Sequence, residues 1–96
     1  MKYQIIVSDG VPEELAHHAD FVGQVSQAAA EKLFSAFRTA VNSLESMPDR
    51  CPYFKAHKRY RYLMFEKRYA IIFEISGAVI YIDHLIDLRQ EYDWLF

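Results

Sequence analysis

The sequence predicts an α+β fold of two layers, in which a helical hairpin packs on a small, mainly antiparallel sheet. Residues 59–90 form three apolar runs separated by two short breaks, as expected for consecutive strands joined by tight turns. Residues 27–47 carry apolar side chains with helical spacing, and a short β-branched run at residues 3–7 begins the chain. The expected order is β-α-α-β-β-β, in one domain of residues 1–96.

The N-terminal part is expected to form one strand and the first helix. Residues 3–7 (YQIIV) favour a strand, which residues 8–10 (SDG) end. Pro12 suits the first turn of a helix, where its missing N–H costs nothing, and Gly23 is expected to stop the helix. The apolar positions between them recur with helical spacing at Leu15, Ala19 and Val22.

The second helix carries the clearest periodic pattern. Ser26 is expected to cap its N-terminus and Pro48 to end it. Its apolar stripe comprises Ala30, Leu33, Phe34, Phe37, Val41 and Leu44. Because so few residues join the two helices, they should form an antiparallel hairpin.

The three C-terminal runs are rich in β-branched and aromatic residues, which favours strands over 59–65, 69–75 and 78–86. The breaks between them are short enough to force antiparallel hairpins. On the last run, regular alternation places one set on an apolar face, Ile80, Ile82, His84 and Ile86, and another on a wetter face, Tyr81, Asp83 and Asp87. Tyr53 and Phe54 should tuck the loop before these strands against the core.

Composition and charge restrict the function. The chain is 52% hydrophobic with only three glycines and three prolines, which excludes a disordered protein. One cysteine, Cys51, and no apolar run of membrane-spanning length favour a cytoplasmic protein without a membrane partner. The net charge of −2 argues against a general polyanion binder, yet residues 50–68 hold seven bases and one acid. This local basic patch indicates an anion-binding surface.

No metal or cofactor is expected. The chain lacks a Cys/His cluster at metal-ligand spacing and a Gly-rich phosphate loop. His17 and His18 are adjacent on the first helix and cannot face the same way. His84 is expected to be a half-buried histidine with a satisfied side chain rather than a general base.

Five segments carry a family likeness: Ala28-Ala29-Ala30, Leu44 with Met47-Pro48, Arg59-Tyr60-Arg61, residues 69–75 (YAIIFEI) and residues 82–90 (IDHLIDLRQ). In this order, over nearly the whole length, they resemble the RelE/ParE superfamily of toxins from type II toxin–antitoxin systems, often labelled plasmid stabilisation proteins. The resemblance implies a small sheet carrying an N-terminal helical hairpin, a cytoplasmic protein that inhibits growth, and a cognate antitoxin protein as partner.

The resemblance leaves the molecular target open between two mechanisms. Some members cleave messenger RNA in the ribosomal A site, and others inhibit DNA gyrase. The first hypothesis is a toxin that inhibits translation as a ribosome-dependent mRNA interferase, with ribosome-bound mRNA as target. The alternatives are a ParE-like gyrase inhibitor and a catalytically decayed toxin that only binds its antitoxin.

The cleaving branch also implies candidate catalytic residues. It uses lysines on the second strand, an arginine at the start of the third, and an arginine plus a tyrosine near the C-terminus. Arg61 falls on one second-strand position, and Arg89 and Tyr92 are the C-terminal counterparts. The other second-strand position is Leu63 and the third-strand position is Ala70, so the acid/base set is incomplete.

The basic patch supplies the candidate nucleic-acid-binding residues, Lys58, Arg59, Lys67 and Arg68. Arg59 and Arg61 share a parity and should project from one face, where a guanidinium pair could clamp phosphates. The alternative is that they pair with a carboxylate such as Asp83 or Asp87. Lys67 and Arg68 lie in a predicted hairpin turn, where solubility alone explains their charge.

Overall fold

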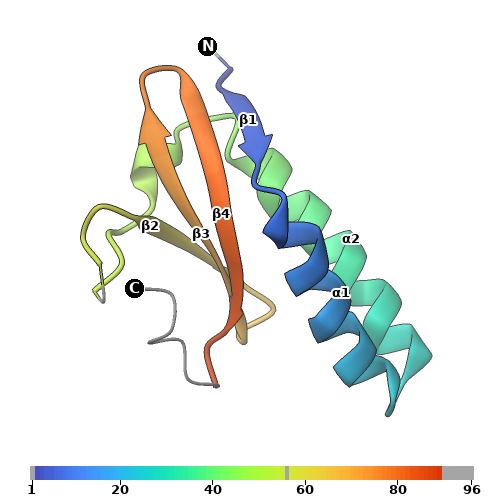
Figure 1. The fold of residues 1–96 in the computed structure, drawn as a ribbon. Coiled ribbons are helices and arrows are strands. Elements are labelled where there is room, and N and C mark those ends of the chain that lie inside the picture. Colours follow the sequence, from blue (N-terminus) through green and yellow to red (C-terminus); the bar gives the residue numbers. More distant parts are fainter. Residues whose placement is uncertain (1, 56, 90–96) are drawn as a thin grey trace.

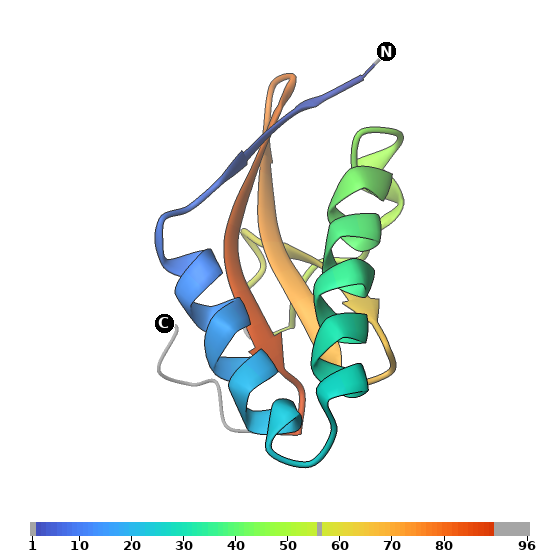
Figure 2. The same cartoon turned by 90° about the vertical axis from the view of Figure 1, so that its right-hand side faces the viewer.

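The computed structural model describes residues 2–55 and 57–89. Two helices lie on one face of a four-stranded sheet, so the fold has two layers (Figures 1 and 2). The elements in chain order are β1 Gln4–Val7, α1 Gly10–Gly23, α2 Gln27–Ser43, the 3-10 turn η1 Pro48–Arg50, β2 Arg61–Phe65, β3 Tyr69–Ser76 and β4 Val79–Asp87. The predicted α+β class and the order β-α-α-β-β-β are confirmed.

The sheet has the order β1-β4-β3-β2. β2, β3 and β4 form the predicted antiparallel meander, in which Phe65 pairs with Tyr69 and Tyr69 with Asp87. β1 joins the other side of β4 in parallel, with Gln4 opposite Val79. The sheet is therefore mixed, and β2 lies at its outer edge.

The helical hairpin begins and turns as the sequence predicts. Pro12 lies in the first turn of α1, and α1 ends at Gly23. The Ser26 hydroxyl caps α2 by accepting a hydrogen bond from the Ala29 N–H at 3.2 Å. A Cβ built on Gly23 would lie 3.5 Å from the Ala30 Cβ, so the helices approach closely where they meet.

The predicted apolar stripe of α2 is largely correct but includes one wrong residue. Leu33 and Leu44 are buried and Phe37 is half-buried against the core. Phe34 is 44% exposed, because the row facing the sheet runs through Leu33, Phe37 and Ala40. Phe34 instead lines an outer groove between the two helices.

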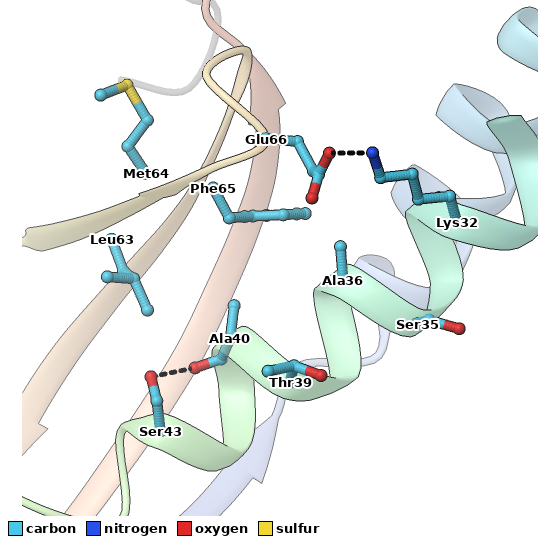
Figure 3. A pocket seen from close by; sticks show the side chains of 10 residues that line it. All are labelled: Lys32, Ser35, Ala36, Thr39, Ala40, Ser43, Leu63, Met64, Phe65 and Glu66. Carbon is cyan, nitrogen blue, oxygen red and sulfur yellow. Dashed lines mark hydrogen bonds and ion pairs between the residues drawn. The ribbon is translucent and has the colours of Figure 1, made fainter.

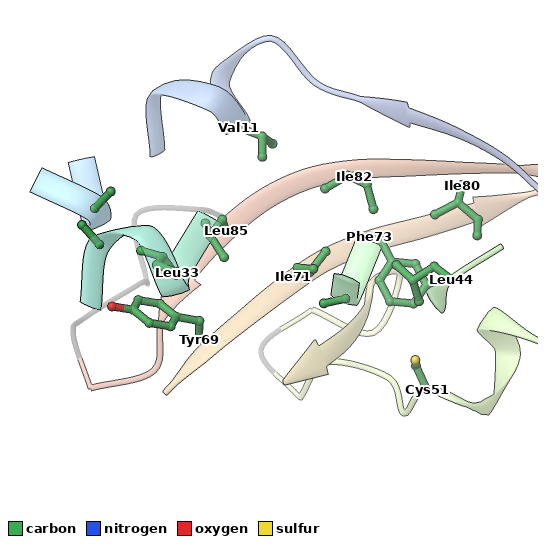
Figure 4. Close-up of a cluster of buried hydrophobic side chains, with 13 residues drawn as sticks. Val11, Leu33, Leu44, Cys51, Tyr69, Ile71, Phe73, Ile80, Ile82 and Leu85 are labelled. Carbon is green, nitrogen blue, oxygen red and sulfur yellow. The ribbon is translucent and has the colours of Figure 1, made fainter. Parts of the chain in front are cut away.

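The main core fills the space between the helices and the sheet (Figure 4). It includes Val11, Leu33, Leu44, Ile71, Phe73, Ile80, Ile82 and Leu85. A second cluster lies on the opposite face of the sheet and contains Phe54, Tyr60, Ala70, Ile72 and Ile86. Phe54 thus packs as predicted, whereas Tyr53 is exposed. The loop before β2 therefore covers part of the face that the helices leave open.

A β-bulge overturns the predicted alternation of β4. Phe73 pairs with Ile82 and Ile72 with His84, so Asp83 is an extra residue on β4. After the bulge, Leu85 faces the main core and Ile86 faces the second cluster, opposite to the prediction. The Asp83 carboxylate accepts a hydrogen bond from the Ser8 hydroxyl at 2.9 Å. Asp87, expected on a wetter face, is buried.

Candidate functional site

Arg61, at the start of β2, holds the preceding loop. One terminal nitrogen of its guanidinium donates to the carbonyl oxygens of Cys51 at 2.6 Å and Asp49 at 3.2 Å. The other donates to the Tyr53 hydroxyl at 3.1 Å, and the guanidinium lies 4.1 Å from the centre of the Tyr53 ring. Through these contacts Arg61 has a structural role, because it holds the loop before β2 against the start of β2.

Arg59 makes different contacts and does not form a clamp with Arg61. Its Nε lies 3.2 Å from Glu74 Oε2, and a terminal nitrogen donates to the Tyr60 hydroxyl at 2.8 Å. The prediction that Arg59 and Arg61 share a face is wrong, because β2 begins only at Arg61 and the alternation of a strand does not extend to Arg59. Arg59 thus pairs with a carboxylate, as the alternative prediction allowed, and that carboxylate is Glu74 rather than Asp83 or Asp87.

The opposite end of the sheet brings together two other arginines. Arg68, in the β2–β3 turn, donates from Nε to Asp87 Oδ2 at 2.9 Å. The Arg89 backbone N–H donates to Asp87 Oδ1 at 2.9 Å, and Arg89 Nε lies 3.5 Å from the same oxygen. Burial alone would raise the pKa of Asp87, but the hydrogen bonds from Arg89 and Arg68 outweigh burial and lower the pKa. Asp87 is therefore held as a carboxylate.

The sequence-predicted residues thus divide into two groups. Arg61 lies opposite Phe73, whereas Asp87, which holds Arg68 and Arg89, lies at the Tyr69 end of β3. Phe73 and Tyr69 are four residue steps apart along β3, about 13 Å at the usual rise of a strand. Lys58 is exposed beside Arg59, and Lys67 is exposed beside Arg68. Tyr92 lies outside the described residues.

Two positions at which the resemblance to the cleaving branch implies basic residues are packing positions here. Ala70 is fully buried in the second cluster, next to Ile72 on β3 and below Phe54 and Tyr60. Leu63 packs against the main core on the helix side of β2. Neither position presents a polar group toward a substrate.

The contact between α1 and β4 contains functional groups that the sequence analysis missed. β1 ends opposite Ile82, and beyond it the helix supplies polar side chains to the edge of β4. Glu14 Oε1 accepts from the Leu85 N–H at 3.0 Å, and His18 Nε2 lies 3.2 Å from the Leu85 carbonyl oxygen. Glu14 Oε2 lies 3.1 Å from His84 Nδ1, so His84 is half-buried with a partner as expected. In the sequence, Glu14 and His18 are four residues apart, which places them on one face of the helix. This spacing is the signal from which their shared contact with β4 could have been predicted.

A groove of about 510 Å³ separates α2 from the edge strand β2 (Figure 3). Small side chains form its helical wall, Ser35, Ala36, Thr39, Ala40 and Ser43. Leu63, Met64 and Phe65 form the strand wall, and Met64 is 53% exposed. An ion pair between Lys32 and Glu66, at 3.4 Å, bridges the helix and the end of the strand. The groove is mostly apolar and follows the outer edge of β2, which the preceding loop covers at Arg61 and Tyr62 through the Tyr53–Arg61 bridge and the hydrogen bond from the Tyr62 N–H to the Pro52 carbonyl oxygen.

Two features are absent from residues 2–55 and 57–89. Within these ranges no three His, Cys, Asp or Glu side chains are grouped so that they could hold a metal ion. None of the helices in these ranges has the length and apolar character needed to cross a membrane.

Comparison with known proteins identifies the family. Residues 5–92 match the model of the family described as "ParE toxin of type II toxin-antitoxin system, parDE". The chain also resembles a solved structure, the chromosomal ParDE TA system from P. aeruginosa, at a TM-score of 0.76 and 16% sequence identity. That likeness covers 90% of this chain and 96% of the other, and it shows the fold. A search of curated proteins gave no match. Because the family match spans nearly the whole chain, this protein belongs to the ParE toxin family of type II toxin–antitoxin systems, within the RelE/ParE superfamily.

Proposed function

We propose that this ParE-family toxin acts by binding and inhibiting DNA gyrase, and that it does not cleave mRNA. The observation that carries the proposal is the environment of Ala70. Where the cleaving branch places an arginine, this chain has a fully buried methyl group below Phe54 and Tyr60. The face of the sheet at this position is filled by packed aromatic side chains.

Cleavage of a phosphodiester by general acid/base chemistry needs charged groups held toward the reacting phosphate. Leu63 and Ala70 supply none, and three oxygen atoms of the loop before β2 already occupy the Arg61 guanidinium. Turning Arg61 toward a substrate would leave two backbone carbonyls without this donor. Inhibition by binding to a protein requires no acid/base set, so it agrees better with these contacts.

We further propose that the cognate antitoxin occupies the groove between α2 and β2. The groove has small side chains along the helix and the exposed Met64 on the strand, which suits insertion of apolar side chains. β2 is also an edge strand whose first two residues pair with the preceding loop, and an extended segment can add to the rest of the edge, residues 63–65, through backbone hydrogen bonds. The solved relative is named as a ParDE toxin–antitoxin system, which supports a protein partner for this chain.

The target is tested by inducing the toxin and following growth, supercoiling and mRNA ends together. We expect growth arrest, inhibition of supercoiling by the purified toxin, relief of both by the antitoxin, and an unchanged profile of mRNA 5′ ends. New ends at A-site codons that disappear in Arg61→Ala and Arg89→Ala would contradict the proposal and establish cleavage. If the folded toxin neither arrests growth nor inhibits supercoiling, the result would favour the alternative of a decayed toxin that only binds its antitoxin.

The antitoxin site is tested with Thr39→Arg, which places a long side chain in the groove. Asn42→Arg is the matched control, because it adds the same side chain to an exposed position of α2 that does not line the groove. We expect Thr39→Arg to weaken antitoxin binding at least about tenfold, since the longer, charged side chain occupies the space into which apolar side chains of the antitoxin would insert. Equal affinities of the two variants would refute the assignment of the groove.

A further inference from the structure

Arg68 and Arg89 share one buried carboxylate at the end of the sheet where the β2–β3 turn meets the end of β4. Each guanidinium approaches a different oxygen of Asp87, Arg68 at Oδ2 and Arg89 at Oδ1. Both contacts use Nε, so Asp87 holds each guanidinium group through the same atom. The Asp87 side chain has no exposed surface, whereas those of Arg68 and Arg89 are 23% and 61% exposed.

Within the described part of the chain, the terminal nitrogens of both guanidinium groups are available. Among residues 2–55 and 57–89 they have no hydrogen-bond partner, because the hydrogen bond of Arg68 and the ion pair of Arg89 both use Nε. A guanidinium offers two parallel N–H groups along its terminal edge, which match the two oxygens of a carboxylate or phosphate. Arg68 and Arg89 therefore each present an unused two-pronged donor.

Arg68 is also fixed by neighbouring rings. Its guanidinium carbon lies 5.1 Å from the centre of the Tyr69 ring and 5.9 Å from that of Phe21. Phe21 belongs to α1 and is half exposed. A side chain held in place before binding loses less conformational entropy when a ligand arrives, so these contacts prepare Arg68 for recognition.

The charges of this cluster are not balanced. Two arginines and one aspartate leave one net positive charge, and the exposed Lys67 adds another beside them. Glu66, the nearest acid of the turn, already pairs with Lys32. An incoming anion would neutralise the cluster, and the apolar surface of Phe21 lies next to the place where it would bind.

We propose that Arg68 and Arg89, held by Asp87, form a site for a carboxylate of an acidic, partly apolar segment of the protein that the toxin inhibits. This inference rests on the proposed function, because it takes the target to be a protein. The net charge of −2 of the chain argues for a single carboxylate contact rather than a nucleic acid, which is bound through many phosphates by extended positive surfaces.

The test compares Arg68→Gln and Arg89→Gln with Lys55→Gln. Lys55 is an exposed base in the loop before β2, so its replacement removes the same charge elsewhere. Arg89→Lys is a fourth variant, which keeps the charge but loses the two-pronged donor. Antitoxin affinity and the melting curve report whether each variant is folded. Arg89→Gln keeps the backbone N–H that binds Asp87, so it should fold even if Arg68→Gln does not.

We expect the gyrase affinity of both Arg→Gln variants to fall at least about 30-fold, which is the lower end for truncating one partner of a desolvated charge pair. Arg89→Lys should lie between Arg89→Gln and the unmodified toxin, and Lys55→Gln should change the affinity less than threefold. Growth arrest in cells should fall in the same order. Unchanged gyrase affinity and growth arrest in a folded Arg89→Gln would overturn the proposal.

Two further outcomes separate this inference from the proposed function. If the unmodified toxin does not bind gyrase, the proposed target is wrong, and the site is then judged by growth arrest alone. Arrest that is lost in Arg89→Gln and kept in Lys55→Gln would still support the site. A 20-nucleotide single-stranded RNA and a duplex DNA fragment serve as phosphate probes. Binding of either that depends on both arginines, with unchanged gyrase affinity, would identify a phosphate site and refute the carboxylate proposal.

Discussion

Replacing Asp87 by asparagine tests whether the buried carboxylate holds the end of the sheet together. In the structure its two oxygens accept from Arg68 Nε and from the Arg89 N–H, each at 2.9 Å. Asparagine has one carbonyl oxygen and an amide NH₂ group in place of the second oxygen. The NH₂ group must face one of the two donors, so Asp87→Asn loses one hydrogen bond as well as the negative charge.

The expected destabilisation is about 3 kcal/mol. Breaking a buried ion pair by removing one partner costs about 3–5 kcal/mol, and a hydrogen bond to a charged group contributes about 1.5–3 kcal/mol. The lower end applies because asparagine keeps one acceptor and because Arg68 remains partly exposed. A domain of this size has a stability of about 5–15 kcal/mol, so the variant should still fold.

The pH dependence provides an independent check of the cause. Since the hydrogen bonds lower the pKa of Asp87 in the folded state, its contribution is fully present above the unfolded-state pKa, about 3.9. That contribution is lost as the pH falls through the folded-state pKa. The stability difference between the unmodified protein and Asp87→Asn should therefore be constant near pH 7 and shrink progressively below about pH 4.

Urea denaturation followed by far-UV circular dichroism measures this difference at each pH. Asp20→Asn is the control, because Asp20 is an exposed carboxylate on α1. It should change the free energy of unfolding by less than about 0.5 kcal/mol, as for surface substitutions generally. A loss below about 1 kcal/mol for Asp87→Asn at pH 7, or a loss that does not change in acid, would refute the reasoning.

Three further predictions concern the core, the contact of α1 with β4 and the cysteine. Phe73→Ala, at a fully buried position, should lower the free energy of unfolding by about 3–5 kcal/mol, and Phe37→Ala, at a half-buried one, by clearly less; equal losses in denaturant melts would contradict this ranking. Glu14→Ala leaves an N–H of β4 without its acceptor and should cost about 1–3 kcal/mol, whereas the exposed Glu13→Ala should cost little in the same melts. Burial raises the pKa of the Cys51 thiol despite two nearby arginines, so a thiol reagent at pH 8 should modify it slowly in buffer and rapidly in urea; rapid labelling of the native protein would show that the thiol is accessible.

The elements of the fold could be predicted because their signals are local. The cap at Ser26, the stop at Gly23 and the β-branched run at 69–75 each act within a few residues of the chain. Antiparallel pairing of the last three strands followed from turns too short for any other connection. The order of the five segments described above and the length of the chain then indicated the family.

The candidate site could be predicted only in part, because its contacts join residues distant in sequence. A bulge at Asp83 adds one residue to β4, and a regular two-residue period cannot reveal where an alternation shifts. The sequence suggests phosphates or a carboxylate as partners of Arg61, but two of its partners are backbone carbonyls, which every residue carries and no pattern distinguishes. Arg68 and Arg89 meet only because Asp87 pairs with Tyr69 across the sheet.

The parallel pairing of β1 with β4 has a consequence for how the protein is made. β1 precedes both helices in the chain and lies beside β4, which follows the other three strands, with Gln4 opposite Val79. The helical hairpin can form while translation continues, but the sheet that covers its apolar face cannot close until β4 has left the ribosome. A product truncated before residue 79 would lack the strand that receives β1 and carries Asp87. The two surfaces proposed above for antitoxin and target therefore form only after β4 has been synthesised, and we expect a chain that terminates before residue 79 to be inert rather than partly toxic.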